Sequence, residues 1–159
     1  MATWLVRGTW RAYASSMQGP QPIRAVSLVC RRAGRFLLVR RGRPPAEGLL
    51  AFPGGRVESG ESDEEAARRE LLEETGLVAG TLLHLRTIVI TPEPNVASSP
   101  RFALAVFIAD GISGEGRPGD DAASLHWMNI DEMAREPITE STLVIAREVA
   151  GGAEAIGSQ

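Results

Sequence analysis

The chain has 159 residues, of which 43% are hydrophobic, and it carries a formal net charge of −3 at pH 7. This length and composition suit one globular domain with a substantial core, and two independent domains would be cramped. The acidic balance argues against a nucleic-acid polymer as the partner, because binding a phosphate backbone usually needs a basic surface.

Residue usage excludes several further classes of protein. Cys30 is the single cysteine and lies in an apolar stretch, so we expect a buried thiol and a cytoplasmic location. No apolar run approaches the roughly 18 residues of a membrane span, so we expect no membrane partner. All 17 basic residues are arginine, which removes chemistry that requires a lysine, and two histidines give little support to a histidine-rich zinc site.

The predicted elements interleave strands with helices. Residues 1–20 end in a polar, turn-forming run and are predicted to be an N-terminal extension. β-branched and aromatic residues predict strands at Ile23–Cys30, Phe36–Val39, Leu82–Ile90 and Phe102–Ala109, and further helices are expected at Asp131–Arg135 and Ser141–Ala150. This order indicates an α/β layered domain over residues 21–150, followed by a C-terminal tail at 151–159.

Two loops are candidates for the border of an active site. Thr91–Pro100 carries three prolines, and Gly111–Ala122 is rich in glycine and ends near two adjacent acids. Binding and catalytic residues often lie on such loops, although plain surface connections are the common alternative.

The strongest local signal is the helix between these strands. Ser62 and Glu65 form a capping box, and Gly76 supplies the usual left-handed residue after the last turn, which predicts a helix from about Asp63 to about Thr75. Three glutamates of this helix share one sector of about 100° and repel one another; they are Glu70, Glu73 and Glu74. A hard divalent cation would offset that repulsion, and an ordinary solvated face is the alternative.

The segment Phe52-Pro53-Gly54-Gly55 precedes this helix. Two glycines allow close backbone approaches that a side chain would block, so the carbonyl groups here can reach a metal. A simple tight turn is the alternative interpretation of the same pair.

Taken together, these residues resemble the Nudix box. The chain matches the 23-residue pattern of this box without a departure. The matching positions are Gly55, then after five residues Glu61, after seven more Arg69-Glu70-Leu71, after one Glu73-Glu74, and after one Gly76-Leu77. Nine set positions are far more specific than a lone glycine pattern. The resemblance covers roughly residues 22–149, although the tryptophan often found before Phe-Pro-Gly-Gly is replaced by leucines and Ala51. It implies a Nudix-type α/β/α sandwich with a mixed central sheet.

The resemblance also implies an activity, which is hydrolysis of a pyrophosphate bond in a nucleoside diphosphate derivative with Mg²⁺, or alternatively Mn²⁺, as the cofactor. It implies metal ligands at the Gly54 carbonyl, Glu70, Glu73 and Glu74, and catalytic roles for Glu73, Arg69, Asp120 and Asp121. Gly55, Glu61 and Gly76 are implied as structural positions of the motif. The arginine-rich hairpin adds Arg40 and Arg41, beside Gly55, as candidate substrate-binding residues, because guanidinium groups bind phosphate bidentately.

The substrate prediction depends on a proline. Within this family, a proline about 15 residues after the box is associated with ADP-ribose hydrolysis, and Pro92 occupies that position. We therefore expect ADP-ribose or a nucleotide sugar as the small-molecule partner, with a homodimer as a candidate assembly. The alternatives are hydrolysis of an oxidised nucleoside triphosphate and a non-catalytic, nucleotide-binding regulator. Isoprenoid diphosphate isomerisation would need a catalytic cysteine, and Cys30 lies in a predicted strand.

Overall fold

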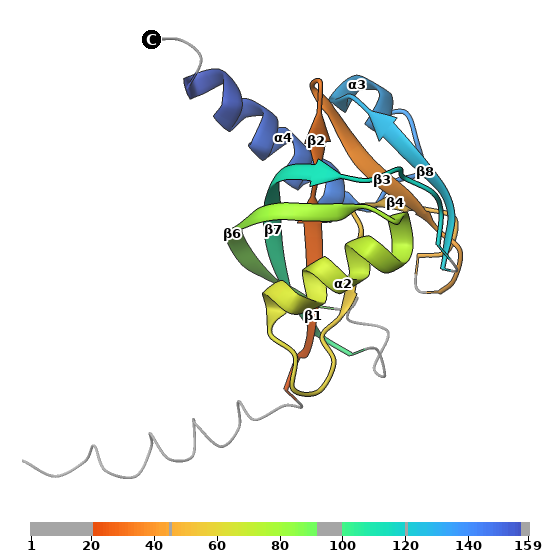
Figure 1. Cartoon of the computed structure of the whole chain (residues 1–159), viewed down its shortest axis with the longest axis vertical. Coiled ribbons are helices and arrows are strands. Elements are labelled where there is room, and N and C mark those ends of the chain that lie inside the picture. Colours follow the sequence, from red (N-terminus) through yellow and green to blue (C-terminus); the bar gives the residue numbers. More distant parts are fainter. Residues whose placement is uncertain (1–20, 45, 92–99, 120, 157–159) are drawn as a thin grey trace, which may run out of the picture.

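The computed structural model describes residues 21–44, 46–91, 100–119 and 121–156 (Figure 1). The expected N-terminal extension, Pro92 and Asp120 therefore lie outside the described residues. The strands are β1 (Ile23–Val29), β2 (Arg31–Arg32), β3 (Arg35–Arg41), β4 (Leu50–Ala51), β5 (Gly54–Arg56), β6 (Val78–Ile90), β7 (Phe102–Ser113) and β8 (Ala122–Met128). The helices are α2 (Asp63–Thr75), α3 (Ile130–Met133) and α4 (Glu140–Ile156).

The strands form two sheets. In the first, the order is β5-β1-β7-β6, with β1 parallel to β7 and the other pairs antiparallel. In the second, β3 pairs antiparallel with β2, β4 and β8. One hydrophobic cluster joins the strands to α2, and a second joins them to α3 and α4. The mixed sheet between helices confirms the predicted α/β fold class.

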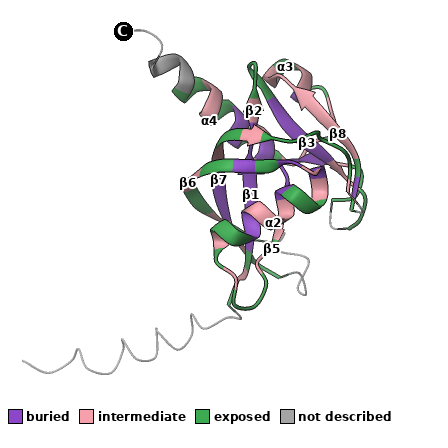
Figure 2. Ribbon diagram, viewed as in Figure 1, coloured by how far each residue is buried: buried purple, intermediate pink, exposed green. Residues whose placement is uncertain are grey.

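The strands β1 and β3 are buried on both faces over most of their length (Figure 2). In β1, Leu28 packs with the α2 cluster and its neighbour Val29 packs with the α4 cluster. In β3, Leu37 and Leu38 divide in the same way. Since successive side chains of a strand point to opposite faces, a strand between two helical layers must be apolar at consecutive positions.

The structure contains the predicted strands and helices at the predicted places in the chain, but several of them begin or end at other residues. β6 begins at Val78 instead of Leu82, and β7 continues to Ser113, because the two strands pair from Val78↔Ser113 to Ile90↔Phe102. The predicted loop at Gly111–Ala122 is shortened accordingly. α4 continues to Ile156, so much of the expected tail is helical. No helix in the described part of the chain is long and apolar enough to cross a membrane.

Local signals set the two ends of α2. The Ser62 side chain accepts from the Glu65 amide, and the Glu65 side chain accepts from the Ser62 amide, which completes the predicted capping box. Gly76 has φ of 70° and its amide donates to the Leu72 carbonyl. The first turn carries three acidic residues, which the positive end of the helix dipole favours, whereas the last turn carries no basic residue.

An ion pair fastens the loop before α2 to the helix itself. The Arg69 guanidinium donates to both carboxylate oxygens of Glu61, at 2.8 and 3.0 Å, and to the Arg56 carbonyl at 3.0 Å. The hydrogen bond from Arg69 and a second from the Glu58 amide lower the pKa of Glu61 to about 2. The entry to α2 is therefore held by a bidentate, charge-assisted contact.

Cys30 follows β1 and lies inside the α2 cluster. Its side chain is fully buried, and burial raises the pKa of the thiol to about 12. The thiolate is the nucleophilic form of cysteine, so burial and the raised pKa both disfavour reaction of this thiol in the folded protein. This placement gives the isomerase alternative little support.

We predict that Cys30 resists thiol reagents in the folded state. At pH 8, Ellman's reagent should label the native protein far more slowly than the protein unfolded in guanidinium chloride, because the native thiol is neutral and enclosed. Rapid stoichiometric labelling under native conditions would contradict the buried position.

A second prediction concerns the pH dependence of stability. The pKa of Glu61 is lower in the folded chain than its usual value of 4.5, so the ionised carboxylate stabilises the fold above that value and the effect is lost as the pH falls towards 2. The difference in free energy of unfolding between wild type and Glu61→Gln should therefore be full at pH 7 and shrink below pH 4.5. Urea denaturation across this range measures it.

Glu58→Gln is the matched control, because Glu58 is an exposed glutamate of the same loop. It should leave the stability close to that of wild type across the range. A Glu61→Gln difference that grows as the pH falls would contradict the role given to the ion pair.

Candidate active site

A cavity of about 250 Å³ opens between β5, the second half of α2 and the loops that flank β3 and β8. Its lining combines carboxylates, guanidinium groups and glycine backbone; the residues are Arg41, Arg43, Pro44, Gly54, Gly55, Arg56, Glu70, Glu74 and Asp121. The cavity thus brings together predicted metal ligands, a predicted acid and a predicted phosphate-binding arginine from four separate segments.

Two of the three predicted glutamates face this cavity. Glu74 accepts a hydrogen bond from the Gly54 amide at 3.0 Å, and burial raises its pKa to about 7. Burial also raises the pKa of Glu70, against the lowering effect of a 2.8 Å hydrogen bond from Arg69. Both carboxylates lose hydration in the fold, and each accepts a hydrogen bond from the protein, Glu74 from the Gly54 amide and Glu70 from the Arg69 guanidinium. A cation in the cavity would therefore stabilise their charged forms.

The two glycines of β5 are required by close approach. A Cβ atom on Gly55 would overlap the Glu70 carboxylate, and one on Gly54 would overlap the Val26 carbonyl oxygen of the neighbouring strand β1. The absence of side chains lets the backbone of β5 lie directly against α2. This is the close packing that the Gly-Gly pair predicted.

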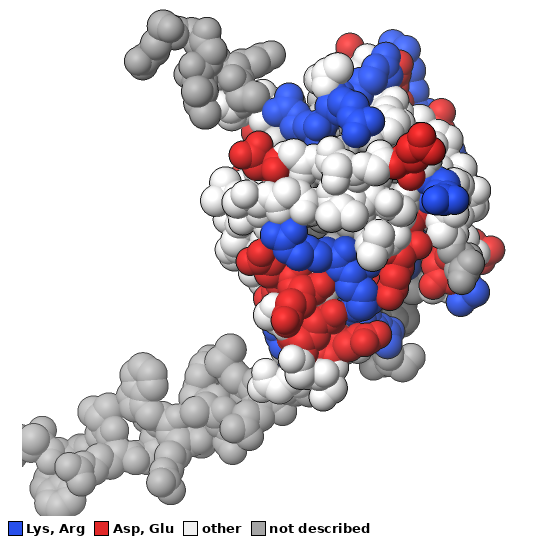
Figure 3. All heavy atoms as spheres, in the orientation of Figure 1, with Lys and Arg blue, Asp and Glu red and all other residues white. Residues whose placement is uncertain are grey.

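Glu73 has a different environment from its two neighbours. Its side chain is 60% exposed, and it pairs with the Arg69 guanidinium at 3.2 Å. It is absent from the cavity lining. Arg69 itself contacts Glu61, Glu70 and Glu73, so it links the entry loop to the glutamates of α2, as expected for an orienting residue. The acidic side chains over α2, with arginines between them, are visible in Figure 3.

Of the two predicted loop acids, Asp121 reaches the cavity and Asp120 lies outside the described residues. Asp121 pairs with Arg43 at 2.9 Å, and its carbonyl accepts from the Gly42 amide at 3.1 Å. Its negative charge contributes to the raised pKa of Glu74. The structure thus joins a residue preceding β8 to the glutamates of α2, which sequence distance alone did not establish.

The arginines around the cavity differ from those predicted. Arg41 lines it, whereas Arg40 donates to the Gly48 carbonyl and pairs with Glu136, outside the cavity. Strand neighbours point to opposite faces, and the ladder between β3 and β8 also shifts register between Arg40 and Arg41. The structure therefore does not bring Arg40 to the candidate site.

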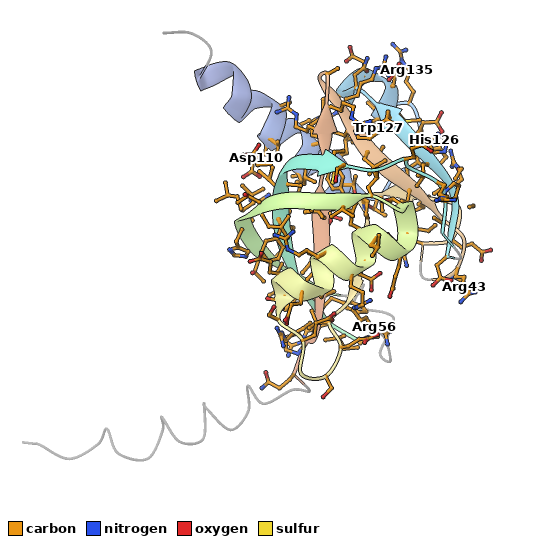
Figure 4. The ribbon with its side chains drawn as sticks, viewed as in Figure 1. Arg43, Arg56, Asp110, His126, Trp127 and Arg135 are labelled. Carbon is orange, nitrogen blue, oxygen red and sulfur yellow. The ribbon has the colours of Figure 1, made fainter. Side chains whose placement is uncertain are left out.

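Two further arginines complete the lining. Arg43 and Arg56 both line the cavity. Figure 4 labels Arg56 below α2 and Arg43 near the lower end of β8. Arg56 also lies over the Phe102 ring, at 5.8 Å from its centroid. The sequence alone singled out neither arginine; the available signal for Arg56 was that it directly follows the Gly-Gly pair.

The donor set fits a hard divalent cation. Among the described residues, no three Asp, Glu, His or Cys side chains already converge to form a complete metal site. The cavity nevertheless offers two partly buried carboxylates, Glu70 and Glu74, next to glycine backbone that approaches without side chains. Mg²⁺ commonly takes one or two carboxylates and fills its other positions with water and substrate phosphate, so an incomplete protein cage suits it.

The chain is similar to known proteins of one family. The NUDIX domain model matches residues 20–148. The chain is 35% identical over 116 residues to an ADP-ribose pyrophosphatase of Methanocaldococcus jannaschii, covering 72% of this chain and 66% of that protein. It is 35% identical over 100 residues to an oxidized purine nucleoside triphosphate hydrolase of Danio rerio, covering 63% of this chain and 62% of that protein.

The chain thus spans less than two thirds of the length of these two curated relatives. A solved structure of a MutT Nudix hydrolase from Burkholderia pseudomallei has a TM-score of 0.73 at 30% identity, covering 81% of this chain and 98% of that chain. A family model that matches most of the chain, together with this structural similarity, agrees with the intact motif on α2. The chain belongs to the Nudix hydrolase family.

Proposed function

We propose that this protein hydrolyses a pyrophosphate bond of a nucleoside diphosphate derivative with the help of Mg²⁺. One observation carries the proposal: Glu70 and Glu74 face the same cavity as the Gly54-Gly55 backbone and the three lining arginines. The carboxylates match the needs of a divalent cation, and the arginines match those of a diphosphate. Desolvated carboxylates that line a cavity are typical of functional sites, which supports the proposal.

Different residues of the site have different proposed roles. The proposed metal ligands are Glu70, Glu73, Glu74 and the Gly54 carbonyl. When bound, a divalent cation neutralises phosphate charge and makes water more acidic. Arg41, Arg43 and Arg56 line the cavity and are the proposed partners of the phosphate oxygens, while Arg69 orients the glutamates.

In the proposed reaction, a water oxygen forms a bond to phosphorus and the bond from phosphorus to the bridging oxygen breaks. The water proton passes to a carboxylate oxygen. Asp121 is the described loop acid that lines the cavity, and Glu73 is absent from that lining, which supports Asp121 as the acceptor. For ADP-ribose the products are AMP and ribose 5-phosphate.

ADP-ribose or a nucleotide sugar is the proposed substrate class. The M. jannaschii relative carries the name ADP-ribose pyrophosphatase, and Pro92 supplies the sequence marker. The Danio rerio relative carries a different name, so an oxidised nucleoside triphosphate is the second candidate substrate. A non-catalytic nucleotide-binding regulator is the third candidate, although the intact set of glutamates favours an enzyme.

The remaining parts of the proposal concern setting and assembly. Mn²⁺ is the alternative cofactor, because it also prefers oxygen ligands. The buried single thiol of Cys30 agrees with a reducing, cytoplasmic location. A homodimer stays a prediction.

The first test removes charge from α2. Glu74→Gln and Glu73→Gln should each lower kcat by about 100-fold or more if these side chains hold the metal, because the amide keeps the size and loses the charge. Glu64→Gln on the exposed first turn of the same helix is the control and should keep wild-type activity. Wild-type kcat and magnesium dependence in both test variants would overturn the assignment.

The second test compares substrates. At one magnesium concentration, kcat/KM should be higher for ADP-ribose than for diadenosine polyphosphates or oxidised deoxynucleoside triphosphates. Chromatography of the ADP-ribose reaction should show AMP and ribose 5-phosphate. Release of inorganic pyrophosphate from a triphosphate as the fastest reaction would reject the ADP-ribose assignment and leave the hydrolase assignment intact. Absence of turnover across the panel would favour the regulator.

A further inference from the structure

The last turn of α2 is capped by a distant loop. The Arg117 amide donates to the Thr75 carbonyl and the Gly119 amide donates to the Glu74 carbonyl, both at 2.8 Å. The last carbonyls of a helix have no partner within the helix and must be satisfied from outside. Here the loop between β7 and β8 supplies two backbone donors, and we call this pair of hydrogen bonds the loop clamp.

Glu74 is consequently fixed at both of its ends. Its side chain accepts from the Gly54 amide of β5 at 3.0 Å, and its main-chain carbonyl accepts from Gly119. The backbone of this glutamate therefore cannot shift along α2 without breaking the loop clamp. The position of its carboxylate in the cavity depends on contacts to two separate segments.

The same loop clamp also governs the position of Asp121. The Gly119 carbonyl accepts a hydrogen bond at 3.1 Å from the amide of Ala122, the residue directly after Asp121. On the other side, the Asp121 carbonyl accepts from the Gly42 amide. Gly119 thus connects the last turn of α2, through its own amide and carbonyl, to the segment that carries Asp121, which also lines the cavity.

Only glycine fits at position 119. A Cβ atom there would overlap the Glu73 carbonyl oxygen and would come within 2.9 Å of the Glu73 carbonyl carbon and 3.2 Å of Glu74 Cα. These are backbone atoms of the helix, so a larger residue must push the loop away from α2. Gly116 in the same loop differs, because a Cβ atom there would meet only ordinary side-chain contacts, the nearest at 3.5 Å.

We propose that Gly119 is a positioning residue for the reaction, because it seats the loop clamp on α2 and thereby sets the separation between Asp121 and Glu74 across the cavity. The proposal rests on the proposed function for its kinetic part. Its structural part, the loop clamp, can be tested without any substrate.

The kinetic test uses Gly119→Ala with Gly116→Ala as the matched control. Gly119→Ala should lower kcat on ADP-ribose by about tenfold or more and change KM by less than about threefold. The reason is that a small displacement of a reacting group slows the chemical step. Gly116→Ala should stay within about twofold of wild type. Equal losses in both variants would mean that the loop tolerates no substitution and would overturn the specific role of Gly119.

A double-mutant cycle distinguishes positioning from simple destabilisation. If Gly119 acts through Asp121, the effect of Gly119→Ala on kcat should fall below about twofold in an Asp121→Asn background, because the displaced group is already disabled. The same factor in both backgrounds, or wild-type activity of Asp121→Asn alone, would overturn the proposal.

Amide hydrogen exchange tests the loop clamp without any substrate. Its first measurement uses the wild-type protein alone, and its second compares the two glycine variants. The Arg117 and Gly119 amides should be protected from exchange, and Gly119→Ala should lose that protection at both positions while Gly116→Ala keeps it. Rapid exchange of both amides in the wild type would overturn the loop clamp itself. Protected amides together with no turnover of any nucleotide would instead count against the proposed function alone.

Discussion

The site depends on one steric constraint, which is that the backbone of β5 lies against the carboxylates of α2 with no side chain of its own in the way. Gly54 and Gly55 provide this contact, and a Cβ atom on either would overlap β1 or the Glu70 carboxylate. The contact carries two carboxylates into a partly buried cavity and gives one of them, Glu74, a backbone donor. Because burial raises the pKa of both glutamates, the fold holds them in an environment that favours an added positive charge.

Contacts elsewhere in the molecule hold β5 and α2 in this arrangement. Arg69 ties the entry loop to the helix, the apolar layers of β1 and β3 hold the sheets between two helical faces, and the loop before β8 covers the end of α2. These restraints come from segments far apart in the chain. A cavity assembled from so many segments requires the complete fold, and no isolated helix would reproduce it.

The sequence predicted the parts of the site that local chemistry encodes. The limits of α2 were predictable because the Ser62 capping box and Gly76 are signals within a few residues. Which of Arg40 and Arg41 faces the cavity was not, because it depends on strand orientation and on an irregular ladder between β3 and β8. Arg56 was missed because β5 has only three residues and shows no periodicity. The position of Asp121 follows from tertiary hydrogen bonds that no local pattern records.

The charge distribution along α2 has an energetic consequence. Its three acidic residues at the start lie where the helix dipole stabilises them, but Glu73 and Glu74 lie in a last turn that has no basic residue. Carboxylates at that negative end oppose the dipole, by about 0.3–1 kcal/mol each when exposed. At the exposed position of Glu73, a lysine or arginine would interact more favourably with the dipole. The C-terminal half of α2 is therefore electrostatically frustrated, which is the expected compromise where a functional charge takes precedence over the stability of the element that carries it.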